Sequence, residues 1–212
     1  ALRNLVGAER FFAAGPDREA LAVRRMAGWL AQGDPASLTD MEQADAVLVL
    51  GEDLTATAPR AALALRQTAR GAAMALAAEK GVPAWLDNAA RVAGEGRRTP
   101  IALVTTMPDA LDDVATWSLR PAPEDVAGVG RAVAAALRGD AAEGDVASIA
   151  EALKDATRPL VVAGFGTGQS DVVEAAGEVA DALGEHARLA FFPPEANSLG
   201  LALIGAEGLD GA

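Results

Sequence analysis

Residues 164–170 form the glycine-rich segment of this chain whose composition is best suited to binding a ligand. The segment reads GFGTGQS and places Gly164, Gly166 and Gly168 between an apolar strand and a helix. Backbone N–H groups in such a loop, together with a helix N-terminus, can bind a phosphate group. The segment lacks the GxGxxG spacing and the GK[ST] ending of phosphate-binding fingerprints. We therefore favour a tight turn in which Ser170 caps the following helix, with phosphate binding as the alternative.

Gly51, Glu52 and Asp53 follow a second apolar strand, at the kind of strand end where open α/β sheets bind their ligands. Two adjacent carboxylates would repel a diphosphate, but they could bind a ribose hydroxyl or a divalent cation. Thr55 and Thr57 allow a simpler interpretation, in which these polar side chains cap the helix that follows. We favour capping.

Asn197 and Gly200 are a third candidate pair, because an Asn followed by a Gly at a turn before an apolar helix could contact a ligand. A capped loop without a ligand would have the same sequence. The three tryptophans, Trp29, Trp85 and Trp117, are expected in the core or at an interface, since no basic residues alternate with them as in a base-stacking surface.

Few other residues could perform catalysis or bind a metal. Asp109, Asp112 and Asp113 could be metal ligands, but acidic residues at the start of a helix, expected here from 109 to 115, are explained by the helix dipole. His186 is the single histidine and lies in a polar loop, and the chain has no Cys and no Tyr. The sequence therefore predicts no catalytic residue and no metal ligand.

Apolar strands alternate with helices along the chain, which is typical of an α/β fold with a parallel sheet. Strands are expected at 46–50, 101–105, 117–119, 160–164 and 189–192. Helices are expected at 18–32, 37–44, 59–69, 124–137 and 170–183, and a second alanine-rich helical stretch is expected to end at residue 79. Residues 139–144 are small and polar, and we expect them to link a first α/β unit, 1–138, to a second one, 145–212. The second unit looks truncated, and we expect the chain to be a fragment of a longer polypeptide.

Charge and hydropathy exclude two classes of protein. The net charge of −12, a pI near 4.5 and scattered basic residues disfavour a nucleic-acid partner. The longest apolar runs are far shorter than the roughly 18 residues that a membrane helix needs, and no signal sequence opens the chain. We expect a soluble, cytoplasmic protein with no direct membrane insertion.

Several spaced stretches, 44–53, 60–67, Trp117 with 121–125, and 197–200, resemble the large iron–sulfur subunit of bacterial respiratory complex I, the G subunit of NADH-quinone oxidoreductase. The resemblance covers nearly the whole chain and falls within the molybdopterin-oxidoreductase-like region of that subunit. It implies Rossmann-like, three-layer parallel-sheet units as in the molybdopterin oxidoreductase family.

The chain departs from the molybdopterin family at two strand ends. The resemblance implies Gly-x-Asn after residues 46–50 and Asp-Pro-Arg after residues 101–105. This sequence has Asp53 in place of the Asn, and residues 106–109 (TMPD) in place of the second motif. An anion therefore replaces an amide and a cation is absent, and both changes weaken the binding of a diphosphate.

The resemblance implies a vestigial fold that carries no molybdenum and is a non-catalytic structural segment. Iron–sulfur clusters are expected in the full subunit, on cysteines outside this chain. The implied partners are the rest of the subunit and the other subunits of the peripheral arm, on the cytoplasmic side of the bacterial inner membrane.

Two alternatives assign a ligand to the chain. One is an active molybdopterin-dinucleotide-binding segment of an oxidoreductase, and the other is a stand-alone nucleotide-binding regulator that uses residues 164–170. We expect no cofactor. If a relic pocket binds one, the candidate residues are Gly51, Asp53, Gly164, Gly166, Gly168, Asn197 and Gly200.

Overall fold

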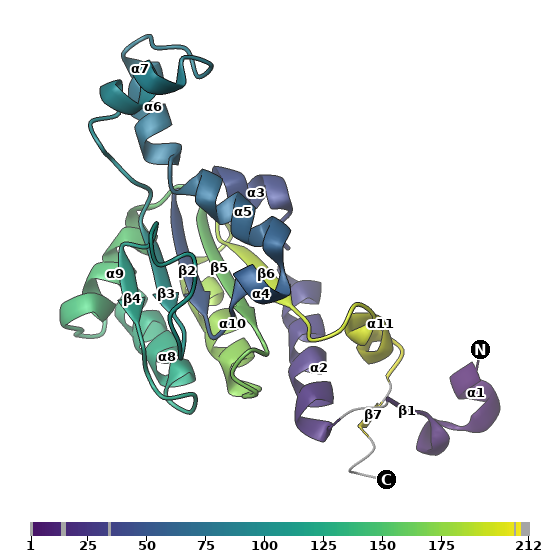
Figure 1. Cartoon of the computed structure of the whole chain (residues 1–212). Coiled ribbons are helices and arrows are strands. Elements are labelled where there is room, and N and C mark those ends of the chain that lie inside the picture. The colour runs from purple at the N-terminus through teal and green to yellow at the C-terminus, as the bar shows by residue number, and fades with distance from the viewer. Residues whose placement is uncertain (1, 14–15, 34, 206, 209–212) are drawn as a thin grey trace.

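The computed structural model describes residues 2–13, 16–33, 35–205 and 207–208, and it is built around a five-stranded parallel sheet (Figure 1). The strand order is β4-β3-β2-β5-β6, and every neighbouring pair is parallel. The strands are β2 (Ala46–Leu50), β3 (Ile101–Val104), β4 (Trp117–Leu119), β5 (Pro159–Gly164) and β6 (Arg188–Phe192). The expected α/β fold with a parallel sheet is confirmed.

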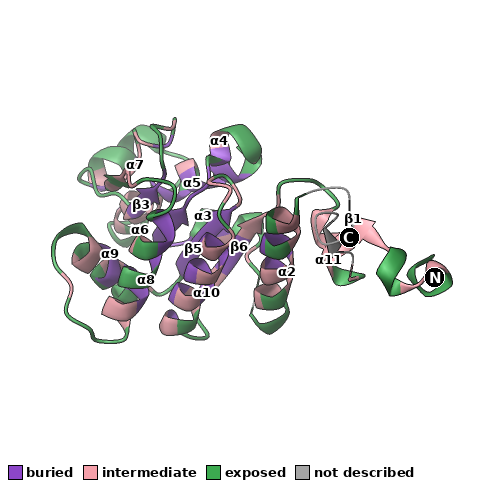
Figure 2. Ribbon diagram, turned by 90° about the horizontal axis from the view of Figure 1, so that it is seen from below, coloured by how far each residue is buried: buried purple, intermediate pink, exposed green. Residues whose placement is uncertain are grey.

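The three central strands are buried along their whole length, because helices cover both faces of the sheet (Figure 2). Strands in such a position are continuously apolar rather than alternating. This is why the run AVLVL was recognisable as a strand from the sequence. The register pairs Leu50 with Val104 on one side and with Ala163 on the other, so the ends of these strands lie at one edge.

Two layers of helices complete the fold. One face of the sheet, which includes Leu48 and Val161, packs against α8, α9 and α10. The other face, which includes Val49 and Val162, packs against α3, α4 and α5. The bounds of these helices are α3 (Leu38–Gln43), α4 (Leu54–Thr57), α5 (Pro59–Thr68), α8 (Val126–Leu137), α9 (Gly144–Asp155) and α10 (Asp171–Leu183).

A further helix, α2 (Asp17–Gln32), packs against α10 through Met26 and Val173. Beyond α2 lie α11 (Ser198–Leu203), α1 (Leu2–Val6), the 3-10 turn η1 (Ala8–Arg10) and a two-stranded parallel sheet of β1 (Phe12–Ala13) and β7 (Glu207–Gly208) (Figure 1). Residues 209–212, which belong to the second expected unit, lie outside the described residues.

Residues 70–98, here called the arm, extend away from the sheet between α5 and β3 (Figure 1). The arm consists of α6 (Gly71–Glu79) and α7 (Asp87–Ala93). Its two ends meet where the N–H of Thr99 donates to the carbonyl of Ala69 over 3.2 Å. The sequence predicted α6 as an alanine-rich stretch but gave no prediction of α7.

One expected helix is absent. Residues 110–114 form turns, because Asp109 accepts a hydrogen bond from the N–H of Leu111 and Asp112 accepts one from the N–H of Asp109 over 3.0 Å. These carboxylates therefore satisfy local backbone donors in a turn, which competes with helix formation. The expectation of a helix here is wrong.

Residues 138–143 connect α8 to α9, and strands from both sides of this segment share the one sheet. The division into units at this point stays a prediction about how the chain is organised. None of the helices within the described residues has both the length and the hydropathy needed to cross a bilayer.

Candidate functional site at the carboxyl edge of the sheet

The sequence candidates after β2 and β5 meet at one place because these strands are neighbours in the sheet. From β2 the chain continues to β3 on one side, whereas from β5 it continues to β6 on the other side. The direction of winding therefore changes between β2 and β5. In open α/β sheets a ligand crevice forms at the carboxyl ends of the strands at such a switch point.

The side chain of Glu52 fills the space between these two strand ends. Glu52 is 3% exposed, and its Oε2 accepts a hydrogen bond of 2.9 Å from the backbone N–H of Gly166. Its Oε1 accepts a hydrogen bond of 2.6 Å from the hydroxyl of Thr57. Burial raises the pKa of the Glu52 carboxyl above its ordinary value, against the opposing effect of these hydrogen bonds.

The glycines of the loop are needed because the Glu52 side chain lies so close to them. A Cβ at Gly164 would overlap with the Glu52 carboxylate, and a Cβ at Gly166 would lie 2.6 Å from the carbonyl oxygen of Gly51. Gly51 itself has φ +68°, and a Cβ there would lie 2.9 Å from a methyl group of Thr167. These positions therefore admit only glycine without rearrangement.

Gly168 has a different role, since a Cβ there would meet nothing within 4 Å. Its φ is +71°, and its N–H donates to the carbonyl of Phe165 over 2.8 Å to close a turn. Ser170 follows at the N-terminus of α10, but its side chain makes no capping hydrogen bond. Its hydroxyl instead accepts a hydrogen bond of 3.3 Å from Arg25 of α2, so the expected cap is wrong.

Asp53 caps a helix, as favoured from the sequence, although the helix is α4 rather than one that begins near Pro59. Its Oδ1 accepts hydrogen bonds from the N–H groups of Thr55 and Ala56, at 3.0 and 3.2 Å. Thr57 does not cap a helix, because its hydroxyl donates to Glu52 and to the carbonyl of Asp53.

The electrostatic environment of this edge is negative. The charge of Asp53 contributes to raising the pKa of Glu52 and of Asp109, although burial is the largest cause in both cases. Asp109 Oδ2 is buried and has no hydrogen-bond partner among the described residues. The Glu52 carboxylate already accepts the hydrogen bond from the N–H of Gly166, and the carboxylates of Asp53 and Asp109 lie close by. These residues do not fit an anionic dinucleotide, because it would have to displace Glu52 and approach like charges.

Asn197 and Gly200 are not part of this edge. They lie at the start of α11, which packs against α2 on the side away from α10 (Figure 1). A Cβ at Gly200 would lie 2.5 Å from Asn197 Oδ1, so the Gly permits the side chain of Asn197 to fold over the helix start. The structure therefore separates this pair from the other five candidates.

Two of the three acidic residues after β3 form ion pairs. Asp112 pairs with Arg120 and accepts a hydrogen bond of 2.7 Å from Ser118, and Asp113 pairs with Arg66 over 2.9 Å. Within the described part of the chain, no three His, Cys, Asp or Glu side chains are grouped so that they could hold a metal ion. His186 is exposed in a turn between α10 and β6.

Two of the three tryptophans are partly buried and one is not. Trp29 packs against the outer side of the core and donates a hydrogen bond of 3.0 Å to Glu174, while Trp117 is half-buried in β4. Trp85 is 80% exposed at the end of the arm. A core position for Trp85 is therefore wrong, and an interface position stays a prediction.

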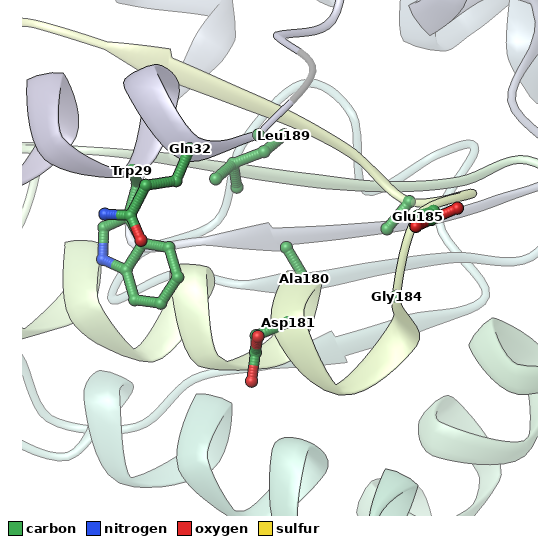
Figure 3. Close-up of a pocket in the computed structure, with 9 residues that line it drawn as sticks. Trp29, Gln32, Ala180, Asp181, Gly184, Glu185 and Leu189 are labelled. Atoms are coloured by element: carbon green, nitrogen blue, oxygen red, sulfur yellow. The ribbon is translucent and has the colours of Figure 1, made fainter.

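A pocket of about 320 Å³ lies at the opposite edge of the sheet, where β6 begins and where α2 and α10 end (Figure 3). Trp29 and Gln32 line it from α2, and Ala180 and Asp181 line it from α10. The carboxylate of Asp181 lies 3.5 Å from the guanidinium of Arg138. None of the residues that the sequence singled out for ligand binding lines this pocket.

Glu52 is the residue that the sequence did not single out correctly. It was considered only together with Asp53, as a residue that could bind a ribose hydroxyl, bind a divalent cation or cap a helix. The sequence did contain a signal, because one buried strand is followed by Gly-Glu and a second buried strand ends in Gly-x-Gly. Only the pairing of β2 with β5 shows that this Glu lies against that glycine-rich loop.

The comparisons with known proteins identify the family. No protein-family model matches the chain. The G subunit of NADH-quinone oxidoreductase is 42% identical in Pseudomonas putida, 39% in Pseudomonas fluorescens and 34% in Escherichia coli K12, and each alignment covers 100% of this chain and 25% of the relative. The chain thus spans about a quarter of the length of these curated relatives.

A solved structure shares the fold. A chain in the crystal structure of the formyltransferase/hydrolase complex from Methylorubrum extorquens, in complex with methylofuran, matches with a TM-score of 0.55. The match covers 89% of this chain and 50% of that chain at 15% identity, and it concerns the fold alone. Because the sequence similarity extends over the whole chain at 34% to 42% identity, the chain belongs to the G-subunit family of NADH-quinone oxidoreductases.

Proposed function

We propose that this chain is a non-catalytic structural segment of an NADH-quinone oxidoreductase subunit, whose whole complex transfers electrons from NADH to quinone. The observation that carries the proposal is the hydrogen bond between Glu52 Oε2 and the N–H of Gly166. A buried carboxylate of the chain itself lies where a phosphate would have to bind at the switch point.

The same site supports a structural role for the glycine-rich loop. Glu52 connects the end of β2 to the loop after β5 and to Thr57 of α4, so one side chain holds three elements together. A buried carboxylate that loses its hydrogen-bond partners destabilises the folded state, because its desolvation is then no longer compensated. The loop therefore serves the packing of the sheet edge in this proposal.

In this proposal the segment is surrounded by the rest of its own subunit and by other subunits of the complex. The full subunit would carry iron–sulfur clusters on cysteines outside this chain, which has none. The segment would bury its surfaces against the rest of its subunit and against other subunits of the peripheral arm of complex I. That arm would lie on the cytoplasmic side of the inner membrane.

The test is to purify the complete complex with its full-length G subunit and to measure molybdenum by mass spectrometry and pterin by the fluorescence of its oxidation products. We expect neither in a stoichiometric amount, while NADH oxidation is present. One molybdenum and one pterin per complex would overturn the proposal and support the molybdopterin-dinucleotide alternative.

A second measurement addresses the nucleotide-binding alternative. Titration of the full-length subunit with guanine nucleotides and with NADH, comparing the wild type with Glu52→Gln, should show no binding that depends on residue 52. Glu52→Gln removes the charge but keeps the size of the side chain. Binding to the wild type that is lost on Gly166→Val, with the fold retained, would favour a nucleotide site at residues 164–170.

A further inference from the structure

The pocket of about 320 Å³ at the start of β6 is separate from the Glu52 site, because it lies at the opposite edge of the sheet (Figure 3). Its volume falls within the range of small-molecule sites, about 300–1,000 Å³. Trp29, Ala180 and Leu189 give it apolar walls, and Gln32 adds a polar group. Apolar walls with a few polar groups are the usual composition of a site for a small ligand.

Trp29 is the aromatic residue of the pocket, and its indole ring is held in place. The ring N–H donates a hydrogen bond of 3.0 Å to Glu174, which lies 3.1 Å from the guanidinium of Arg25. The ring also lies so close to α10 that a Cβ on Gly177 would overlap with it. A ring fixed in this way loses little freedom when a ligand binds. The face of an indole ring attracts cations.

The charged side chains that line the pocket are both acidic. Asp181 lies in the last turn of α10, and Glu185 follows two residues after the end of that helix. No basic side chain is found among the described residues that line the pocket. Arg138 lies 3.5 Å from Asp181, but the side chain of Asp181 is 69% exposed, so water screens this pair.

The backbone adds to the negative potential. Both α2 and α10 end at the pocket, where Gly33 and Gly184 are among the lining residues. The C-terminus of a helix carries a partial negative charge from its free carbonyl groups. Neither helix has a basic residue in its last turn, and Asp181 at the end of α10 adds a charge of the unfavourable sign. A cation in the pocket would relieve this repulsion.

We propose that this pocket binds a small organic cation with an apolar body, such as an arylalkylammonium ion. The carboxylates of Asp181 and Glu185 would attract its charged group, and Trp29 and Leu189 would contact its apolar body. The inference goes beyond the proposed function and does not depend on it.

Two other classes of ligand fit the pocket less well. A metal ion needs several oxygen or nitrogen ligands, whereas no three His, Cys, Asp or Glu side chains in the described part of the chain are grouped to hold one. An anion would meet two carboxylates and the C-termini of two helices.

The experiment uses a photoreactive cation, 4-azidobenzylammonium, on the full-length subunit. We expect mass spectrometry to find the label on peptides that contain residues 29–33 or 180–189, and an excess of phenethylammonium to prevent the labelling. The matched control is 4-azidobenzyl alcohol, which has a similar size but no charge, and it should label these peptides at least tenfold less. Equal labelling by both probes, or no label on these peptides, would overturn the inference.

Charge variants test the role of the two carboxylates. Asp181→Asn combined with Glu185→Gln should lower the labelling about tenfold, because it removes both charges that line the pocket. Glu178→Gln, a variant on α10 outside the pocket, should keep it. Circular dichroism checks that the variants are folded. Labelling that the combined variant leaves unchanged, or that Glu178→Gln lowers equally, would contradict the proposed site. The comparison of the two probes on the wild type requires no variant.

Labelling of the complete complex separates a free ligand from a protein segment. We expect the pocket to be labelled there as well as in the isolated subunit. Labelling that is lost in the complex would overturn the inference, because a neighbouring protein segment would then fill the pocket. None of these results concerns Glu52 or Gly166, so a failure of this inference leaves the proposed function unaffected.

Discussion

Glu52 and Gly166, which are separated by 114 residues in the sequence, are joined by a hydrogen bond of 2.9 Å between a buried carboxylate and a backbone N–H. The pairing arises because β2 and β5 are neighbours, so that the residues after each strand face one another. A glycine-rich loop at a switch point is normally interpreted as a phosphate site. Here the protein supplies its own anion, and the loop becomes part of the packing of the sheet edge.

Glu52→Gln should change how stability depends on pH. Burial raises the pKa of Glu52 in the folded protein above its ordinary value of 4.5, so the folded chain binds this proton more tightly than the unfolded chain does. The contribution of Glu52 to the free energy of unfolding is therefore highest below the unfolded pKa and falls as pH rises through the folded pKa. Relative to Glu52→Gln, the wild type should therefore gain stability as the pH falls from 7 toward the ordinary pKa of a glutamate side chain.

Urea unfolding of both proteins at several pH values measures this difference. The other carboxylates titrate in both proteins, so their contributions cancel. A stability difference that stays constant with pH would show that the pKa of Glu52 is not raised by folding.

Gly164→Ala should destabilise the protein by about 2–3 kcal/mol, because the new Cβ would overlap with the Glu52 carboxylate. In a Glu52→Ala background the same substitution should cost at least about 1 kcal/mol less, since the overlapping side chain is gone. The four free energies of unfolding, measured by urea denaturation, form a double-mutant cycle. Additive effects would mean that Glu52 does not pack against Gly164.

The sequence predicted the elements of the fold better than the contacts between them. The strand at 46–50 was found with its observed bounds, because burial on both faces makes it continuously apolar. The pair Glu52 and Gly166 could not be found, since it depends on the order of the strands in the sheet. The turn at Asp109 was mistaken for a helix because its carboxylate bonds to the N–H of Leu111, a local alternative that helix signals do not distinguish.

Asp112→Asn should lower stability at pH 7 by about 1 kcal/mol after allowance for solvent exposure. The guanidinium of Arg120 is the largest cause that lowers the pKa of Asp112 from 3.8 to about 2. A lowered pKa stabilises the fold above the unfolded value of 3.8, and this contribution is lost as pH falls toward the folded value. The difference between Asp112→Asn and the wild type should therefore shrink below pH 3.8.

Asp113→Asn is the matched control for this prediction. Asp113 also pairs with an arginine, Arg66, but its side chain is 61% exposed, so water screens the pair and the loss should be smaller. Chemical denaturation of the three proteins between pH 7 and pH 3 provides the comparison. An equal loss for both variants would contradict the assignment of the stronger pairing to Asp112.

Gly177→Ala should loosen the packing of α2 on α10. A Cβ at Gly177 would overlap with the indole ring of Trp29, which also donates a hydrogen bond of 3.0 Å to Glu174. The ring would have to move, and we expect a loss of about 2–3 kcal/mol in the free energy of unfolding. Gly128→Ala, a helix position with open space around it, should instead stabilise the protein by about 0.5–1 kcal/mol through helix propensity. Urea unfolding followed by circular dichroism distinguishes the two, and a neutral Gly177→Ala would show that Trp29 does not pack against this helix.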